Sequence, residues 1–247
     1  MIEIVTLLLF LSVMQAAGPA EQQYSLAVKA IAARDNANAL GYLEAALTAD
    51  PDNIRYASDY RQLLIQTKQY DRGTNFFDKL VQAHPQAANA HLNYGFVYVD
   101  KIPDSGSITQ VILANKALSH FSKAIELKRS WIALYTRGNS YMYWPRIFNR
   151  THLAVADLEE AMKIQKADRT KTYYIRSYIS LGDAYWKMDN LEKARSVWRE
   201  GLTVFPDNPQ LKARLAANGD GLKALIDDTY DPNKRVDTNL KELWTEQ

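Results

Sequence analysis

The sequence repeats one spacing of small and bulky residues five times between Ala39 and Pro206. Each copy has a small residue, a bulky apolar residue four positions later, and a small or apolar residue three positions after that. The five sets are Ala39/Leu43/Ala46, Gly73/Phe77/Leu80, Ala117/Phe121/Ala124, Ala154/Leu158/Ala161 and Ala194/Trp198/Gly201. Spacings of three and four place these residues on one helical face, and the first two sets begin 34 residues apart. A period of this length predicts a solenoid of stacked helical hairpins, an architecture suited to binding other molecules.

The composition fits one solenoid domain. Of 247 residues, 47% are apolar and 23% are charged, which is ordinary for a globular protein. The formal charge of +2 implies neither a nucleic acid nor a strongly anionic membrane as the partner. The chain has no cysteine, which excludes disulfides, thiolate metal sites and a cysteine nucleophile.

Residues 1–20 differ from the rest of the chain. Residues 4–14 form an apolar run of eleven interrupted only by Thr6 and Ser12, and small residues follow it. A bilayer takes about 20 apolar residues, so this run suits the core of a secretory signal, although Glu3 stands where a basic residue is usual. We expect a signal peptide and a periplasmic or secreted protein. The alternatives are an uncleaved membrane tether, a misassigned start codon and a helix buried against the first repeat.

A second motif appears on the first helix of units three to five. Gly95 precedes Tyr98, Gly138 precedes Tyr141 and Gly182 precedes Tyr185, each by one helical turn. A neighbouring helix can approach at the glycine while the ring fills the groove beside it. The most complete unit combines Leu181, Gly182, Tyr185, Ala194, Trp198, Gly201 and Pro206. With these residues the chain resembles the tetratricopeptide repeat (TPR) superfamily.

The resemblance implies an all-α, right-handed superhelical solenoid of about five TPR-like hairpins. The expected units are residues 21–53, 54–87, 88–130, 131–171 and 172–208. Capping helices at residues 209–228 and a tail at residues 229–247 should follow. A polar-faced cap of this kind seals the last apolar face of a repeat array.

Two hairpins are longer than the pattern requires. The distance from the motif glycine to the small residue is 12 in unit five, 22 in unit three and 16 in unit four. We expect about ten extra residues in a turn beginning near Asp100 and about four more at residues 143–148. Such insertions are either tolerated variation or functional, since insertions in solenoids fall on one edge.

The tail contains a further apolar spacing. Val236, Leu240, Leu243 and Trp244 recur at i, i+4, i+7 and i+8, and Asp237 near the start could cap a helix. This predicts a short amphipathic helix. It either packs back on the array or docks a partner.

The sequence offers no chemistry of catalysis. His84, His91, His120 and His152 lack metal-ligand spacing, and no phosphate-binding glycine loop or nucleophile motif occurs. We expect no catalytic residue, no cofactor and no metal.

The resemblance also assigns the inner surface of the solenoid to certain first-helix positions. The residues expected to bind a partner there are Tyr24, Leu92, Phe96, Tyr135, Asn139, Tyr143, Asp183, Trp186 and Lys187. An aromatic groove suits an apolar helix or an extended peptide. Only Asn139 and Lys187 fit the carboxylate-gripping chemistry of chaperone-tail binders, so we do not expect that ligand. In the alternative, the C-terminal helix or neighbouring hairpins cover the rings.

These observations lead to a functional hypothesis. We expect a non-catalytic, exported scaffold that binds a protein or peptide, and touches a membrane only through an uncleaved N-terminal segment. The alternative is an accessory subunit of a cell-envelope complex, docked through the inserted turns or the C-terminal helix.

Overall fold

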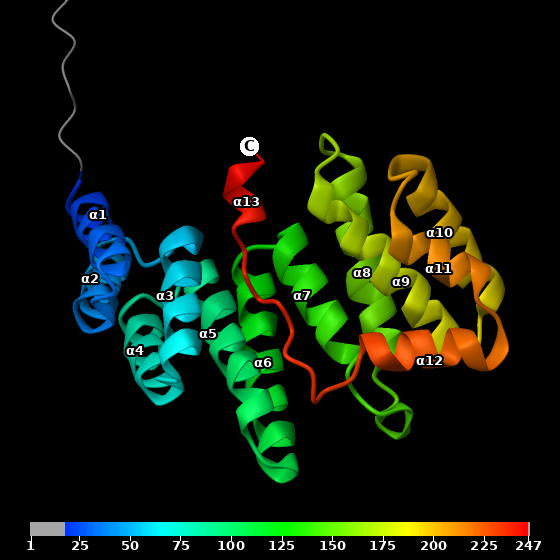
Figure 1. The fold of residues 1–247 in the computed structure, drawn as a ribbon, viewed down its shortest axis with the longest axis horizontal. Helices are drawn as coiled ribbons and strands as arrows, with labels where there is room; N and C mark the ends of the chain where they lie inside the picture. The colour runs from blue at the N-terminus through cyan, green and yellow to red at the C-terminus, as the bar shows by residue number, and fades with distance from the viewer. Residues whose placement is uncertain (1–17, 247) are drawn as a thin grey trace, which may run out of the picture.

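The structure, a computed structural model, describes residues 18–246, and the regular secondary structure in that range is entirely helical. Five hairpins stand side by side in a solenoid (Figure 1). They are α1 (Pro19–Ala32) with α2 (Asn36–Ala49), α3 (Ile54–Thr67) with α4 (Tyr70–Ala83), α5 (Ala88–Lys101) with α6 (Ser107–Leu127), α7 (Trp131–Tyr141) with α8 (Thr151–Lys166), and α9 (Ile175–Lys187) with α10 (Leu191–Val204). The predicted all-α repeat solenoid is confirmed. The predicted export signal, residues 1–20, lies outside the described residues except for positions 18–20, and α1 begins at Pro19.

Polar residues begin several of these helices. The side chain of Asp35 accepts a hydrogen bond from the Asn38 amide, and Asn53 caps α3 in the same way. Asn190 and Asn208 cap α10 and the next helix, α11 (Pro209–Ala216). Each cap satisfies an amide that has no partner inside its own helix.

The glycines of the motif lie against the bulky residue of their own hairpin. A Cβ atom at Gly95 would lie 2.4 Å from the Phe121 ring, and one at Gly182 would lie 2.1 Å from the Trp198 indole nitrogen. At Gly138 the Leu158 side chain is 2.9 Å from that point. The interpretation of the glycine as a point of close helix approach is therefore confirmed.

The insertion in the third hairpin is largely helical, which corrects the prediction of a long turn. Only the short 3-10 helix η1 (Ile102–Asp104) and two further residues connect α5 to α6, and α6 is 21 residues long. Gln110 tightens this connection by donating from Nε2 to the carbonyls of Ile102 and Ser105. In the fourth hairpin the extra residues do form a turn, residues 142–150, which contains the 3-10 helix η2 (Arg146–Phe148). A third 3-10 helix, η3 (Thr172–Tyr174), precedes α9.

After α10 the chain forms α11 and α12 (Gly219–Thr229) and then turns back. Residues 231–246, which we call the tail, run across the middle of the array to the single-turn helix α13 (Glu242–Thr245) (Figure 1). The tail packs on the array, where Leu240 is buried and Leu243 and Trp244 join the same core.

The predicted amphipathic helix beginning near Val236 is wrong apart from that one turn. The Thr238 carbonyl accepts from Arg61, and the Leu240 amide donates to the Ser58 hydroxyl. Side chains of the array thus satisfy backbone groups that a helix would pair internally, and so short a helix is marginal by itself. Asp237 accepts from the Asn239 amide in a local turn.

Candidate partner-binding groove

The nine residues predicted to line the inner surface fall into three places. Tyr24 and Leu92 belong to the core of the array: Leu92 is buried, and Tyr24 stacks on Tyr56 with 4.5 Å between ring centroids. The Tyr24 hydroxyl donates to Asp59 Oδ2 at 2.6 Å, and burial, with the Asp59 carboxylate, raises its pKa to about 12. Neither side chain presents an open surface.

Asp183, Trp186 and Lys187 lie at the C-terminal end of the array. Asp183 is buried in an ion pair with Arg214 of α11, and Lys187 Nζ donates to the Met142 carbonyl at 2.6 Å. Burial lowers the pKa of Lys187. The Arg146 guanidinium lies over the Trp186 ring, 5.5 Å from its centroid. These contacts attach the capping helices and the turn after α7 to α9.

The other four predicted residues meet around one cavity. Phe96, Tyr135, Asn139 and Tyr143 line a space of about 460 Å³ between α5, α6, α7 and the tail. Tyr135 stacks on Trp131 at 5.0 Å, and Asn139 Oδ1 accepts from Ser180 at 2.9 Å, so both are held in place. Trp186 and Lys187, with Tyr143, line a second and more open pocket at the C-terminal end of the array. The partner-binding role of all nine residues stays a prediction.

Both insertions supply walls of this cavity. The lengthened part of α6 contributes Ser107, Gln110, Val111 and Ala114, and the turn after α7 contributes Trp144, Pro145 and Phe148. Arg150 joins the two, since its guanidinium lies 3.6 Å from the Trp144 ring centroid and donates to Asn115 Oδ1 of α6 at 3.1 Å. The irregular spacing was the sequence signal for these residues, which the predicted site omitted.

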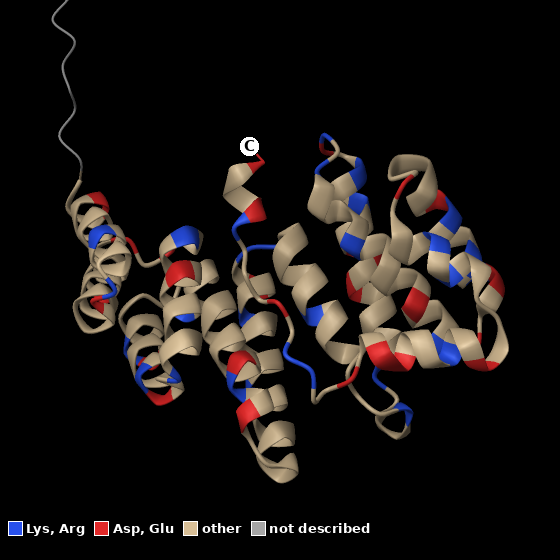
Figure 2. Ribbon diagram, in the orientation of Figure 1, with Lys and Arg blue, Asp and Glu red and all other residues tan. Residues whose placement is uncertain are grey.

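Apolar side chains beside the cavity are exposed to solvent. We call them the insertion patch: Ile108, Val111, Ile112, Ile147 and Phe148. Ile108 is 82% exposed and Ile147 is 88% exposed, while Val111 and Phe148 also line the cavity. Exposed apolar clusters of this kind mark interaction surfaces. Elsewhere the charges of both signs are interspersed over the helices (Figure 2).

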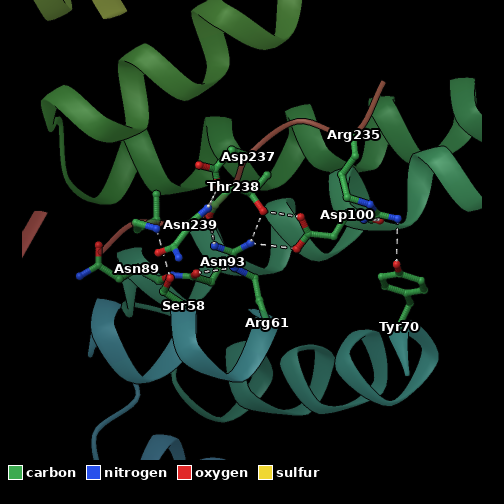
Figure 3. Close-up of polar contacts among 11 residues, drawn as sticks. Ser58, Arg61, Tyr70, Asn89, Asn93, Asp100, Arg235, Asp237, Thr238 and Asn239 are labelled. Atoms are coloured by element: carbon green, nitrogen blue, oxygen red, sulfur yellow. Dashed lines mark hydrogen bonds and ion pairs between the residues drawn. The ribbon is translucent and has the colours of Figure 1, made fainter. Parts of the chain in front are cut away.

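The tail side of the cavity rests on a buried arginine. Arg61 of α3 donates from Nε to Asn93 Oδ1 and from Nη1 to Asp100 Oδ2, both at 2.8 Å (Figure 3). Its Nη2 donates to the Thr238 carbonyl at 2.7 Å, and its Nη1 also lies 3.1 Å from the Thr238 hydroxyl. Burial raises the pKa of Asp100, and the Arg61 charge opposes that rise.

The same network continues to either side. The Thr238 hydroxyl donates to Asp100 Oδ1 at 2.6 Å, and Arg235 donates to the Asp100 carbonyl at 2.9 Å (Figure 3). Arg235 also donates to Asp104 Oδ2 at 2.9 Å and to the Tyr70 hydroxyl at 3.2 Å. The predicted site missed Arg61, although the sequence carried a signal: an arginine occupies the glycine position of the second unit.

Within residues 18–246 no cluster of three or more histidine, aspartate or glutamate side chains could hold a metal ion. In the same residues no helix is both long and apolar enough to span a bilayer.

The comparisons with known proteins agree with this fold. The tetratricopeptide repeat pattern matches residues 30–92 and again residues 175–208, on either side of the two insertions. No curated protein matches the chain.

Several solved structures share the architecture at low sequence identity. TTC0263, a thermophilic TPR protein from Thermus thermophilus, is 18% identical with a TM-score of 0.54, over 80% of this chain and 97% of that one. MamA from Desulfovibrio magneticus RS-1 is 15% identical with a TM-score of 0.53, over 79% and 99%. A tetratricopeptide repeat protein from Parabacteroides merdae ATCC 43184 is 14% identical with a TM-score of 0.55, over 93% and 80%.

Proposed function

Because the chain is a tetratricopeptide-repeat protein, we propose that it is a non-catalytic, exported scaffold that binds an apolar segment of a partner protein in the cavity between α5, α6 and α7. The observation that carries this proposal is the cavity itself, which is lined mainly by apolar and aromatic side chains and opens beside the insertion patch. A volume of about 460 Å³ is in the range of ligand sites.

The lining suits the side chains of a protein segment. Tyr135 and Phe96 supply aromatic surface of the kind that dominates binding energy in interfaces. Thr136, Asn139 and Ser140 place polar groups on the same wall, where they can pair with the backbone of a bound segment. Proteins of this repeat family generally act as scaffolds, which supports the non-catalytic assignment.

A photo-cross-linking experiment in the cells of origin tests the cavity. A photoreactive residue replaces Val111, which lines the cavity, or Glu192, which is exposed on α10 away from it. We expect one dominant cross-linked partner from position 111 and none from position 192. The same products from both positions, or none from position 111, would refute the assignment of the cavity.

Export is supported by the apolar run at residues 4–14 and the small residues after it. Mass spectrometry of the mature N-terminus, with cell fractionation, tests it. We expect a chain that begins near residue 21 in an extracytoplasmic fraction. An intact N-terminus in the cytosol would contradict export, but it would not affect the proposal that the cavity binds a partner.

The insertion patch favours a second candidate function, that of an accessory subunit of a cell-envelope complex. Ile108 and Ile147 are exposed at the two insertions, and an obligate assembly would bury them. The tail packs on the array, so in this conformation the patch is the better docking surface.

A further inference from the structure

We propose that Ser58, Arg61, Asn93 and Asp100, which we call the Arg61 site, recognise an extended segment carrying a threonine between two apolar residues. The tail of this chain is the occupant seen in the structure, and a partner segment of the same chemistry replaces it. This inference rests on the proposed function and names the chemistry of the partner.

The Arg61 site recognises one residue through two of its groups. Arg61 donates to the Thr238 carbonyl at 2.7 Å, while Asp100 accepts from the Thr238 hydroxyl at 2.6 Å. A bound segment with valine at this position would keep the carbonyl contact and leave Asp100 without its hydroxyl donor. The planar guanidinium fixes the geometry, because its donors form a rigid fork.

The flanking residues set the register of the segment. In extended backbone alternate side chains point the same way, which places Val236, Thr238 and Leu240 toward the array. Thr238 and Leu240 are buried and Val236 is partly buried, whereas Asp237 and Lys241 are exposed and Asn239 is partly exposed. Residues 236–240 all border the cavity, so the register follows from burial. The Leu240 amide also donates to the Ser58 hydroxyl at 3.3 Å.

Charge complementarity adds a basic residue to the preferred segment. Arg235, three residues before Thr238, pairs with Asp104 at 2.9 Å and donates to the Asp100 carbonyl. The tail therefore defines the pattern Arg-apolar-x-Thr-x-apolar for residues 235–240. A partner segment of that pattern can repeat each of these contacts.

The contacts permit exchange. When the tail leaves, Arg61 keeps Asp100 and Asn93 as partners, so no buried charge loses its counter-ion. Near the chain end Leu243 and Trp244 pack partly buried against the core, and a partner must replace that packing. The polar contacts there, Arg176 with Glu242 and Thr172 with Glu246, lie at partly exposed side chains where ion pairs and hydrogen bonds contribute little. The tether gives the tail an effective concentration in the millimolar range, which a partner must overcome.

A peptide-exchange experiment on the full chain tests the inference. The probe is a fluorescent synthetic peptide with the sequence of residues 232–246, and its anisotropy reports binding. A chain with Thr238→Val and Leu240→Ser, whose own tail is weakened, should bind the probe at least about tenfold more tightly than the unaltered chain, because a competing occupant is removed. Lys241→Ala is the matched control, since that side chain is exposed, and should bind like the unaltered chain.

Variants of the probe test recognition of the hydroxyl. A peptide with Thr238→Val should bind the weakened-tail chain at least about tenfold less tightly. Asn233→Ala should have no effect, because the hydrogen bonds of Asn233 go to Asp231 within the tail and not to the array. Arg61→Lys in the weakened-tail chain should also reduce binding, because an ammonium lacks the fork.

Hydrogen exchange of the unaltered chain is a second measurement, which tests the inference even if the weakened-tail chain does not fold. In the unaltered chain, an excess of unlabelled peptide should accelerate exchange of the Leu240 amide, and the Thr238→Val peptide should not. If the peptide neither binds nor accelerates exchange of the Leu240 amide at concentrations up to about 1 mM, the tail does not leave the Arg61 site, and the inference is overturned. Tails exchanged between two copies, seen as tail-to-array cross-links in a dimer, would assign the site to a second copy and overturn the partner assignment.

The two proposals fail separately. Peptide exchange with no partner cross-linked from position 111 would refute the cavity proposal while the Arg61 site still binds its segment. A cross-linked partner without peptide exchange would refute only the present inference.

Discussion

Asp183 and Arg214 form a two-pronged ion pair that is closed to solvent. Arg214 Nε donates to Asp183 Oδ1 at 2.6 Å, and Arg214 Nη2 donates to Asp183 Oδ2 at 2.8 Å. The Asp183 side chain is 0% exposed and the Arg214 side chain is 1% exposed. The Tyr230 hydroxyl donates to the same carboxylate at 3.0 Å. A residue expected to face a partner thus attaches the capping helices to α9.

Removing one member of this pair should destabilise the protein strongly. Arg214→Met leaves a buried carboxylate without its cation, which costs about 3–5 kcal/mol of unfolding free energy. The combined variant Asp183→Leu with Arg214→Met should recover much of that loss, because no charge then stays buried. Denaturant unfolding followed by circular dichroism measures both.

Lys212→Ala is the control, because Lys212 pairs with Asp207 on the surface of α11. Its effect should stay below about 0.5 kcal/mol. An Arg214→Met variant as stable as this control would show that the pair does not hold the cap.

The Asp183–Arg214 ion pair is a feature that the sequence alone does not predict, whereas it does predict the helix faces. The helix faces followed from apolar spacing, because Leu158 or Trp198 can be buried in only one way once the period is known. A polar residue at an inner position, such as Asp183, can equally well face a ligand or bind the capping helices. Because Arg214 lies 31 residues beyond Asp183, the sequence does not indicate that the two residues pair. The helix predicted for the tail was wrong for a related reason. The apolar spacing of the tail fits a helix, but side chains remote in sequence, above all Arg61, make the contacts that keep the tail extended.

The close approach at Gly182 predicts a sharp difference between two glycines. A Cβ atom at Gly182 would lie 2.1 Å from the buried Trp198 ring, so Gly182→Ala should cost about 3 kcal/mol through overpacking. A Cβ atom at Gly41 of α2 would meet no atom within 4 Å outside the adjoining backbone of its own helix, and Gly41→Ala should stabilise the protein by up to about 1 kcal/mol through helix propensity. Thermal unfolding of the two variants checks the sign of each change, and equal effects would contradict the packing described for the motif.

His91 and His120 predict a loss of stability in mild acid. Their Nδ1 atoms are 3.4 Å apart, so a hydrogen bond between them needs one unprotonated nitrogen. Burial, with the neighbouring His91, lowers the pKa of His120 to about 4, whereas a histidine in the unfolded chain titrates near about 6.5. The unfolded chain therefore binds the proton first, and stability present above about pH 6.5 is lost as the pH falls toward about 4.

The slope from His120 should be below about 1.4 kcal/mol per pH unit, because the ring is only partly buried. His120→Gln should flatten the fall in unfolding free energy between about pH 6.5 and about pH 4, and His152→Gln, at an exposed position of α8, is the control. Equal slopes for the two variants would remove the histidine pair as the cause.

Substitutions in the insertion patch should affect assembly with a partner without affecting the stability of the fold. Ile108→Glu with Ile147→Glu should leave the unfolding free energy within about 0.5 kcal/mol, because both side chains are largely in solvent. If the protein is a subunit of an envelope complex, the same variant should no longer co-sediment with it. Leu191→Glu, another exposed apolar position, serves as the control on α10. Retained assembly of the double variant would exclude the patch as the docking surface.

Filling the cavity should block the partner without unfolding the array. Ala114 lines the cavity from the lengthened part of α6, so the ring in Ala114→Phe can extend into space that a partner side chain would otherwise occupy. Because the cavity can take the ring, unfolding free energy should change by less than about 1.5 kcal/mol, while cross-linking from position 111 should fall at least about tenfold. Ala45→Phe, on α2 and remote from the cavity, controls for the added ring. Undiminished cross-linking in the Ala114→Phe chain would place the partner outside the cavity, because a bound side chain and the new ring cannot occupy the same volume.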